Sequence, residues 1–337
     1  MTRPAPRRRA LVASALAATA LIVAGCSSGD AGETGASGDG RLEVLASFYP
    51  LQYVAEHVGG EHVAVSNLTP PAAEPHDLEL APAQVREIGD ADLVVYLSGF
   101  QTAVDQGIEQ REPAHVVDAA GPAGLEEHPD GAGHEGETAE EHAAHAGEEH
   151  AEEEHGEGGE EGHDHGAVDP HFWLDPTRLA AVGDAVADEL SAIDPDHAEE
   201  YRANAEALTA DLDALDAEYA EALAPCAGAT LVTSHEAFGY LAERYDLHQV
   251  GISGIDPEAE PSPARLREVR QVVQDAGVTT LFFETLVSPK VTQTLADDLG
   301  VGTAVLDPLE GLAEDATDYR GVMESNLEAL TSGLACS

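Results

Sequence analysis

Short apolar stretches alternate with longer amphipathic stretches in both halves of the chain. The strands predicted for the first half are residues 42–47, 62–68, 92–97 and 115–118, with helices at 52–58 and 82–89. The strands predicted for the second half are residues 230–234, 247–252, 280–284 and 303–306, with helices at 236–245, 263–275, 289–299 and 319–330. Such alternation is typical of α/β units with parallel sheets. We therefore predict two lobes, each with a four-stranded, mainly parallel sheet flanked by helices.

Two helical patterns lie between these halves. Residues 176–193 form the first, and the second runs from Pro195 to about Leu223, with Asp194 placed to cap it. A helix of nearly 30 residues is about 40 Å long, enough to run along both lobes as a stiff connection. We expect an N-terminal lobe at 41–194, one rigid linking helix at 195–224 and a C-terminal lobe at 225–337. A rigid connection favours small rather than wide movements between the lobes.

The first 26 residues indicate where the protein is found. Arginines precede an apolar run, residues 10–24, that is too short to span a membrane stably. Val23-Ala24-Gly25-Cys26 then resembles the bacterial lipobox, in which the cysteine is lipidated and becomes the new N-terminus. We expect 1–25 to be a lipoprotein signal peptide, Cys26 to be the lipidated residue and 26–40 to be a flexible tether. An uncleaved anchor helix is the alternative. Both interpretations place the protein outside the cytoplasm, held to the outer face of the cell membrane.

The chain is strongly acidic, with a formal net charge of −50 at neutral pH. The predicted signal peptide contains four arginines and no acidic residue, so its removal makes the charge −54. Nucleic acid is excluded as a natural partner, because binding to it requires lysine and arginine to neutralise phosphates. A charge of this sign and size attracts cations.

Residues 126–166 form a tract dominated by acidic residues, glycine, alanine and histidine. It holds eight of the chain's 16 histidines and 16 of its 65 carboxylates. So few apolar side chains cannot offset the entropy of ordering, and we expect the tract to be disordered. Histidine-rich tracts indicate metal handling, because imidazole is the commonest side-chain metal ligand; a solvated acidic linker is the alternative. The predicted auxiliary metal ligands are His128, His134, His142, His145, His150, His155, His163 and His165.

Two cysteines remain once Cys26 is assigned to the lipobox. They are Cys226 and Cys336. In an oxidising compartment such a pair usually forms a disulfide. The bond would close a loop of about 110 residues and contribute about 4–5 kcal/mol on the chain-entropy model. It would also tie the C-terminus to the start of the second half of the chain.

Four short segments place ligand-type side chains at or near the ends of predicted strands. They are Glu74-Pro75-His76-Asp77, Asp169-Pro170-His171-Phe172-Trp173-Leu174-Asp175, Ser234-His235-Glu236-Ala237-Phe238 and Asp307-Pro308-Leu309. In open α/β sheets, ligands collect beyond the carboxyl ends of the strands. Three imidazoles and one carboxylate make a four-coordinate site suited to Zn²⁺.

These segments resemble the motifs of the family 9 (cluster A-I) solute-binding proteins of ABC transporters for zinc and manganese. The family pattern is Glu-Pro-His-Asp, Asp-Pro-His-x-Trp-Leu-Asp, Ser-His-x-Ala-Phe and a late Asp. The resemblance covers about residues 42–334, and the acidic tract lies where zinc-type members carry a His-rich loop. It implies that His76 and His171 bind the metal from the N-terminal lobe and that His235 and Asp307 bind it from the C-terminal lobe. It also implies two α/β lobes joined by one long helix.

The residue types favour zinc over manganese. Manganese members resemble this pattern but carry a carboxylate at the position of His235, and a third imidazole suits Zn²⁺ better. One departure concerns the first motif. Some zinc members have a glutamate immediately before the first histidine, where this chain has Pro75, and Glu74 is one step further away. The fourth ligand therefore stays open between Asp307, a water molecule and a reaching carboxylate.

We expect a monomeric receptor that captures Zn²⁺ and delivers it to the permease of an ABC importer, without catalysing a reaction. The alternatives are a manganese- or iron-binding receptor of the same family and a surface protein that stores metal in the tract. A zinc hydrolase is disfavoured, because Gly239 replaces the second histidine of H-E-x-x-H after His235. Asp77, Glu236 and Glu284 are expected to orient the ligands. Binding should weaken as the pH falls through about 6.5, the unperturbed histidine pKa.

Overall fold

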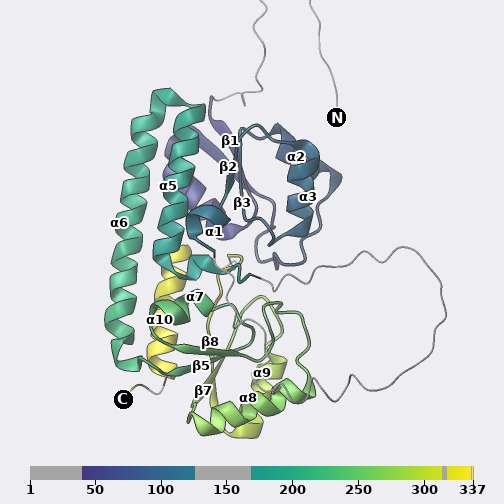
Figure 1. Ribbon diagram of the computed structural model, residues 1–337, viewed down its shortest axis with the longest axis vertical. Coiled ribbons are helices and arrows are strands. Elements are labelled where there is room, and N and C mark those ends of the chain that lie inside the picture. Colours follow the sequence, from purple (N-terminus) through teal and green to yellow (C-terminus); the bar gives the residue numbers. More distant parts are fainter. Residues whose placement is uncertain (1–39, 126–167, 313–316, 335, 337) are drawn as a thin grey trace, which may run out of the picture. The chain divides into compact units, whose positions relative to one another are not determined.

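Two four-stranded parallel sheets organise the computed structural model, which describes residues 40–125, 168–312, 317–334 and 336 (Figure 1). The first sheet has the order β2-β1-β3-β4 and consists of β1 (Leu42–Ala46), β2 (Val63–Asn67), β3 (Leu93–Tyr96) and β4 (Val116–Asp118). The second has the order β6-β5-β7-β8 and consists of β5 (Thr230–Thr233), β6 (His248–Gly251), β7 (Thr280–Phe283) and β8 (Gly302–Val305). All pairings are parallel, so the carboxyl ends of the strands meet at one edge of each sheet. The predicted fold class is confirmed.

Most of the helices agree with the sequence pattern. They are α1 (Tyr49–Gly59), α2 (Pro82–Asp90), α3 (Thr102–Arg111), α4 (Ala120–Ala123), α5 (Pro176–Ile193), α6 (Ala198–Leu223), α7 (Gly239–Arg244), α8 (Pro263–Asp275), α9 (Lys290–Leu299) and α10 (Tyr319–Gly333). The pattern did not predict α3, because this helix buries only Val104 and Gly107 and so lacks a recognisable apolar stripe. The helix predicted from residue 236 begins at Gly239, because the Glu236 backbone N–H instead donates to the carbonyl of Gly254.

The long helix α6 packs against both halves of the molecule. A short 3₁₀ turn at Pro195–His197 precedes it, and Asp194 accepts hydrogen bonds from the His197 ring and from the Tyr201 hydroxyl. Helix α6 contacts α1, α5 and α10, and Figure 1 shows α5 beside one part of its length and α10 beside another. The Tyr219 hydroxyl donates to the Met323 carbonyl of α10. The predicted contact of one long helix with both halves is confirmed.

Alternate residues of the two central strands of each sheet, β1 and β3 or β5 and β7, enter different hydrophobic cores. In β1, Val44 and Ala46 belong to a large core shared with α1, α5, α6 and α10, whereas Leu45 belongs to a smaller core under α2 and α3. In β5, Leu231 faces the large core and Val232 faces a small core under α8 and α9. One core therefore unites the inner faces of both sheets with the long helices, which explains how the two sheets are held around a site between their strand ends.

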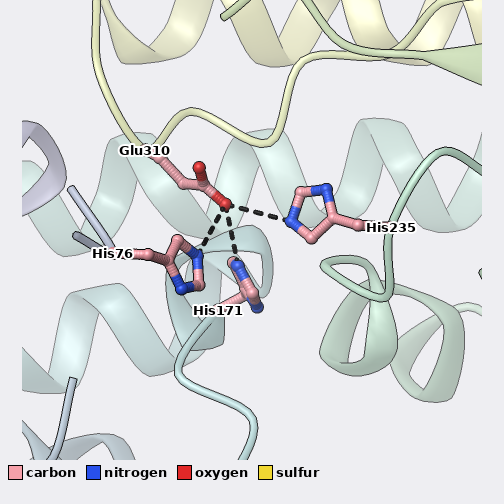
Figure 2. A group of neighbouring side chains, drawn as sticks. All are labelled: His76, His171, His235 and Glu310. Atoms are coloured by element: carbon pink, nitrogen blue, oxygen red, sulfur yellow. Dashed lines mark hydrogen bonds and ion pairs between the residues drawn. The ribbon is translucent and has the colours of Figure 1, made fainter. Parts of the chain in front are cut away.

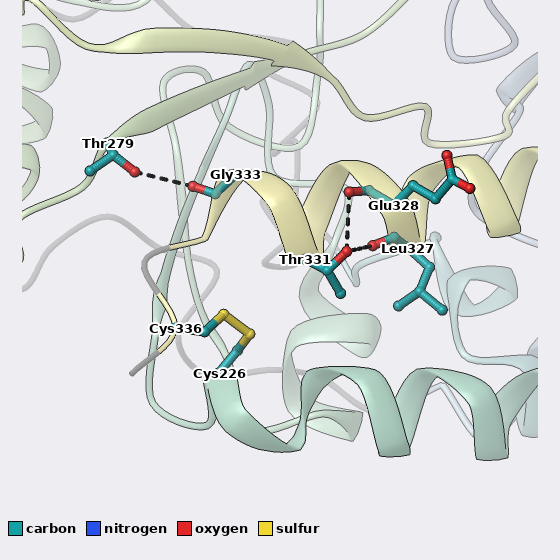
Figure 3. The surroundings of a disulfide bond; sticks show 7 residues. All are labelled: Cys226, Thr279, Leu327, Glu328, Thr331, Gly333 and Cys336. Atoms are coloured by element: carbon teal, nitrogen blue, oxygen red, sulfur yellow. Dashed lines mark hydrogen bonds between the residues drawn. A yellow bond between two sulfur atoms is a disulfide. The ribbon is translucent and has the colours of Figure 1, made fainter.

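A disulfide between Cys226 and Cys336 joins the end of α6 to the segment after α10 (Figure 3). The two cysteines are 110 residues apart in sequence. This confirms the predicted pairing. Among the described residues, no helix has the length and apolar character needed to cross a membrane.

Candidate metal site

Three imidazoles and one carboxylate converge on a single point (Figure 2). Their ligand-type atoms, from His76, His171, His235 and Glu310, all lie within 4.8 Å of one another. The Glu310 Oε1 atom lies 2.9 Å from His171 Nε2, 3.1 Å from His235 Nε2 and 3.4 Å from His76 Nε2. The side chains of His171 and Glu310 are completely buried, that of His235 is 1% exposed and that of His76 is 13% exposed. The site is thus almost closed to solvent, with access beside His76.

Each member of the cluster comes from a loop that follows or precedes a regular element. His76 lies in the connection between β2 and α2, and His171 precedes the 3₁₀ turn Phe172–Leu174 and helix α5. His235 directly follows β5, and Glu310 lies in the loop after β8. The carboxyl ends of strands from both sheets therefore supply the site, as the general rule for open α/β sheets predicts.

Buried carboxylates fix the orientation of two of the rings. His171 Nδ1 lies 2.7 Å from Asp169 Oδ1, and His235 Nδ1 lies 2.8 Å from Glu284 Oε1. Each bond leaves the Nε2 atom of the same ring turned toward the centre of the cluster. A carboxylate behind a ligating imidazole selects the tautomer and raises the basicity of the ring. The rings are therefore prepared to bind a cation through Nε2.

The first two motifs share a hydrogen bond from the histidine backbone to a nearby carboxylate, which was not predicted from the sequence. In both, an acidic residue stands two positions before the histidine with proline between them. The His76 backbone N–H donates to Glu74 Oε1, and the His171 backbone N–H donates to Asp169 Oδ1, both at 2.9 Å. The acid-Pro-His spacing in the sequence was the available signal for these residues.

The fourth predicted ligand, Asp307, lies outside the cluster, and the structure places Glu310 in that position instead. Asp307 Oδ1 accepts a hydrogen bond from the Leu309 backbone N–H, and Oδ2 accepts one from the Thr285 hydroxyl. Both oxygens of Asp307 thus accept hydrogen bonds from the protein, one from its own loop and one from the segment after β7. Glu310 is three residues further on, and its longer side chain enters the cluster (Figure 2). Of the alternatives kept open from the sequence, a further carboxylate is the one found there.

Of the three residues that were expected to orient the ligands, only Glu284 contacts a member of the cluster in this way. Glu284 orients His235 as expected. Glu236 instead forms an ion pair with Arg265 at 2.9 Å, and Asp77 is exposed. The tract histidines, from His128 to His165, and Cys26 lie outside the described residues.

A second group of ligand-type atoms, from Glu61, His62 and Glu200, occurs at the surface, where His62 Nε2 and Glu200 Oε2 are 2.6 Å apart.

Glu310 dominates the electrostatics of the site. Burial raises the pKa of its carboxyl, but hydrogen bonds with His171, His235 and His76 outweigh burial and hold the pKa well below its usual range. Burial lowers the pKa of His235, whereas hydrogen bonds with Glu284 and Glu310 raise it to about 10. For His171, bonds with Asp169 and Glu310 likewise outweigh burial and raise the pKa. Protons on the imidazoles therefore balance a buried anionic carboxylate, and a bound cation would take over that role.

Glu74 is a further carboxyl near the cluster, and it is a poorer candidate for a ligand than Glu310. Its Oε1 atom lies 4.0 Å from His76 Nε2. Burial and the charge of Glu310 raise the pKa of Glu74 to about 9. Glu310 Oε1 lies closer to His76 Nε2, at 3.4 Å, and also reaches the other two rings, so Glu310 is the better candidate.

Zinc affinity is expected to rise with pH between about pH 6 and 9. Zinc needs the neutral imidazole, and the pKa of His235 is raised to about 10, so zinc must displace a proton from this ring below that pH. One displaced proton changes the apparent affinity about tenfold per pH unit. The affinity should therefore keep changing with pH well above 6.5, the pKa of an unperturbed imidazole. Chelator competition at several pH values, and calorimetry in buffers of different ionisation enthalpy, measure the slope and the protons released. An affinity unchanged between about pH 7 and 8 would contradict the raised pKa.

Known proteins resemble this chain over most of its length. A family model described as zinc-uptake complex component A, periplasmic, matches residues 44–333. The zinc-binding protein AdcA of Streptococcus pyogenes serotype M6 is 37% identical over 296 residues, which are 87% of this chain and 56% of that protein. The high-affinity zinc uptake system protein ZnuA of Bacillus subtilis is 35% identical over 325 residues, 95% of this chain and 96% of that protein. The chain spans about half the length of the first curated relatives.

A solved structure shares the fold over most of this chain. The crystal structure of the Zn(II)-bound ZnuA-like domain of Streptococcus pneumoniae AdcA has a TM-score of 0.68 and 32% sequence identity. The similarity covers 87% of this chain and 99% of that domain. Because the family model also spans both sheets, the long helix and all four motifs, the chain belongs to the family of the periplasmic zinc-uptake complex component A.

Proposed function

We propose that this protein captures Zn²⁺ outside the cytoplasm and delivers it to the permease of an ABC importer, without catalysing a reaction. The observation that carries the proposal is the cluster of three imidazole Nε2 atoms around one ionised, buried carboxylate, Glu310. Zinc is typically bound by four nitrogen, oxygen or sulfur ligands in a tetrahedral arrangement. The names of the relatives, a zinc-binding protein and a zinc uptake system protein, support the same cargo.

The donor set favours zinc over manganese or iron as the cargo. Three imidazoles and one carboxylate are softer than the oxygen-rich sets that suit Mn²⁺. His235 supplies the third imidazole, and its ring is held in place by Glu284. A cargo receptor must also release its metal, and access beside the partly exposed His76 gives the ion a short route to solvent.

The proposal includes a lipid anchor at Cys26, which would hold the receptor beside the permease. A family described as periplasmic and a relative named a zinc-binding lipoprotein support this placement. The high negative charge of the chain would concentrate cations around an anchored receptor.

Hydrolysis finds no support in the geometry of the site. Position 239, where a zincin motif would require its second histidine, is occupied by glycine. A Cβ atom at Gly239 would lie 2.5 Å from Asp169 Oδ2, and Asp169 is the residue that orients His171. The position therefore serves close packing behind the cluster.

The metal content of the purified protein tests the proposal most directly. Protein prepared without added metal is expected to contain close to one equivalent of zinc by elemental mass spectrometry. After stripping, calorimetry should show one tight zinc site and a manganese affinity at least about a hundredfold lower. Tight manganese binding with weak zinc binding would favour the manganese-type receptor. Absence of any tight site would exclude the receptor function itself.

Deleting residues 125–166 is expected to leave the tight zinc site nearly unchanged. All four members of the cluster lie outside the deleted segment. A flexible tract would hold its histidines at an effective concentration in the millimolar range but without preorganisation, so its own sites should be weak and exchange quickly. Calorimetry should show loss of the weak sites alone, and growth should slow only when zinc is scarce. If the deletion removed the tight site while circular dichroism showed an intact fold, the tract would contain primary ligands.

A further inference from the structure

We infer that Asp307 is a positioning residue, which shapes the turn 307–310 so that Glu310 points into the metal site. This inference rests on the proposed function of the site as a zinc receptor. It assigns to the conspicuous aspartate of the last motif a role that is separate from metal ligation.

Hydrogen bonds hold both the backbone and the side chain of Asp307. Its backbone N–H donates to Asn326 Oδ1 at 2.9 Å, and its carbonyl accepts from Asn326 Nδ2 at 2.7 Å. Its side-chain Oδ2 accepts from the Thr285 hydroxyl at 3.0 Å. Asn326 belongs to α10 and Thr285 follows β7. Asp307 is therefore attached both to α10 and to the segment after β7.

The remaining oxygen of Asp307 closes the turn. Oδ1 accepts a hydrogen bond of 2.8 Å from the backbone N–H of Leu309, two residues ahead, in an Asx-type turn. Leu309 has a φ of +58°, in the left-handed region that a residue with a branched side chain rarely adopts. Its side chain is completely buried, and this packing, together with the Asp307 bond, holds the unfavourable backbone. Reversal of the chain at Leu309 directs Glu310, the next residue, toward the three histidines (Figure 2).

A residue from the N-terminal half also contacts this turn. Trp173 Nε1 donates to the Pro308 carbonyl at 2.7 Å, and Trp173 is only two residues beyond the cluster member His171. The carbonyl of Trp173 accepts from the Tyr319 hydroxyl of α10, also at 2.7 Å. One short segment therefore supplies an imidazole to the site and also contacts the turn that supplies Glu310. We conclude that Asp307 and Trp173 together set the distance between Glu310 and His171.

Asp307→Ala in the full chain tests the inference, with Glu310→Gln as the ligand-site reference. Alanine removes the bonds to Leu309 and Thr285, so zinc affinity should fall at least about tenfold. Asp307→Asn keeps an oxygen acceptor for Leu309 and should retain near-wild-type affinity. The visible absorption spectrum of Co²⁺-loaded Asp307→Ala should shift toward that of Glu310→Gln, because both lose the same carboxylate from the metal. In the Glu310→Gln background, Asp307→Ala should weaken binding by less than about threefold more.

Ligation by Asp307 itself would give the opposite pattern. Asparagine would then be as harmful as alanine, and the losses from Asp307→Ala and Glu310→Gln would be independent of each other. Thr285→Val provides a second variant in case Asp307→Ala fails to fold, since it removes only one bond to Asp307; it should weaken zinc binding and shift the Co²⁺ spectrum in the same direction as Asp307→Ala. A wild-type spectrum and affinity in every Asp307 and Thr285 variant would overturn the inference. Failure of the wild-type protein to bind zinc would instead overturn the proposed function.

Discussion

Replacement of His171 by alanine is expected to weaken zinc binding by at least about a hundredfold. Zinc sites in small peptides contribute roughly 10–16 kcal/mol in total, so each of four ligands accounts for about 3 kcal/mol. The His171 side chain is completely buried, and its Nε2 atom lies 2.9 Å from Glu310. Removal would therefore take away a ligand and also leave the buried Glu310 carboxylate with one fewer partner. Calorimetry with chelator competition measures the loss, and His76→Ala and His235→Ala should give losses of the same order.

Three histidines outside the cluster serve as matched controls. His57 bonds to the Tyr53 carbonyl in its own helix, His197 bonds to Asp194, and His248 is exposed. Alanine at any of these positions should leave the tight zinc affinity unchanged. Unchanged affinity in two of the three cluster variants would mean that the tight site lies elsewhere in the chain.

Removal of the disulfide by a Cys226→Ser and Cys336→Ser double substitution is expected to lower the free energy of unfolding by about 4–5 kcal/mol. The bond closes a loop of 110 residues, and the chain-entropy model gives large effects for long loops because the unfolded chain regains much freedom. Within the loop lie β5 to β8 and the segment that carries His235 and Glu310. Denaturant titration of the metal-free double variant and the wild-type protein measures the difference.

The proposed zinc site supplies a control for this experiment. The disulfide joins the end of α6 to the segment after α10, and neither segment contributes a member of the cluster. Zinc affinity of the double variant should therefore stay close to that of the wild-type protein under conditions in which both are folded. A change in unfolding free energy below about 1 kcal/mol would show that the unfolded chain does not behave as the entropy model assumes.

Local patterns in the sequence were enough to identify most elements of the fold. Strand β1 reads as a short apolar run because Val44 and Leu45 face different cores and both are buried. Helix α6 is recognisable because Leu208, Leu212 and Leu215 recur at helical spacing. Helix α3 was missed for the converse reason, since it covers its sheet with almost no buried side chains.

The three histidines were predictable because each stands in a short motif that resembles those of the family, and two of the motifs follow strands, where the rule for parallel sheets places ligands. The carboxylate was not. Asp307 follows β8 almost directly and looks like the natural ligand, but it is Glu310 that enters the cluster. The difference depends on the left-handed backbone of Leu309, on Asn326 from α10 and on Trp173 from the other half of the chain. Contacts between residues 135 positions apart in sequence decide which way the turn points, and no local pattern reports them.

Several features could be predicted from the sequence alone: two parallel α/β units, a long helix that contacts both, a disulfide and three of the four members of the cluster. These features follow from periodicity and from residue types at strand ends, which are properties of neighbouring positions along the chain. Only the tertiary structure decided that Glu310 completes the cluster, that Asp169 orients His171 and that His235 has a pKa raised to about 10. The physical reason is that hydrogen bonds and buried charges act over a few ångströms in space. The residues that exert them here come from distant parts of the chain and meet only when both sheets pack against the same helices.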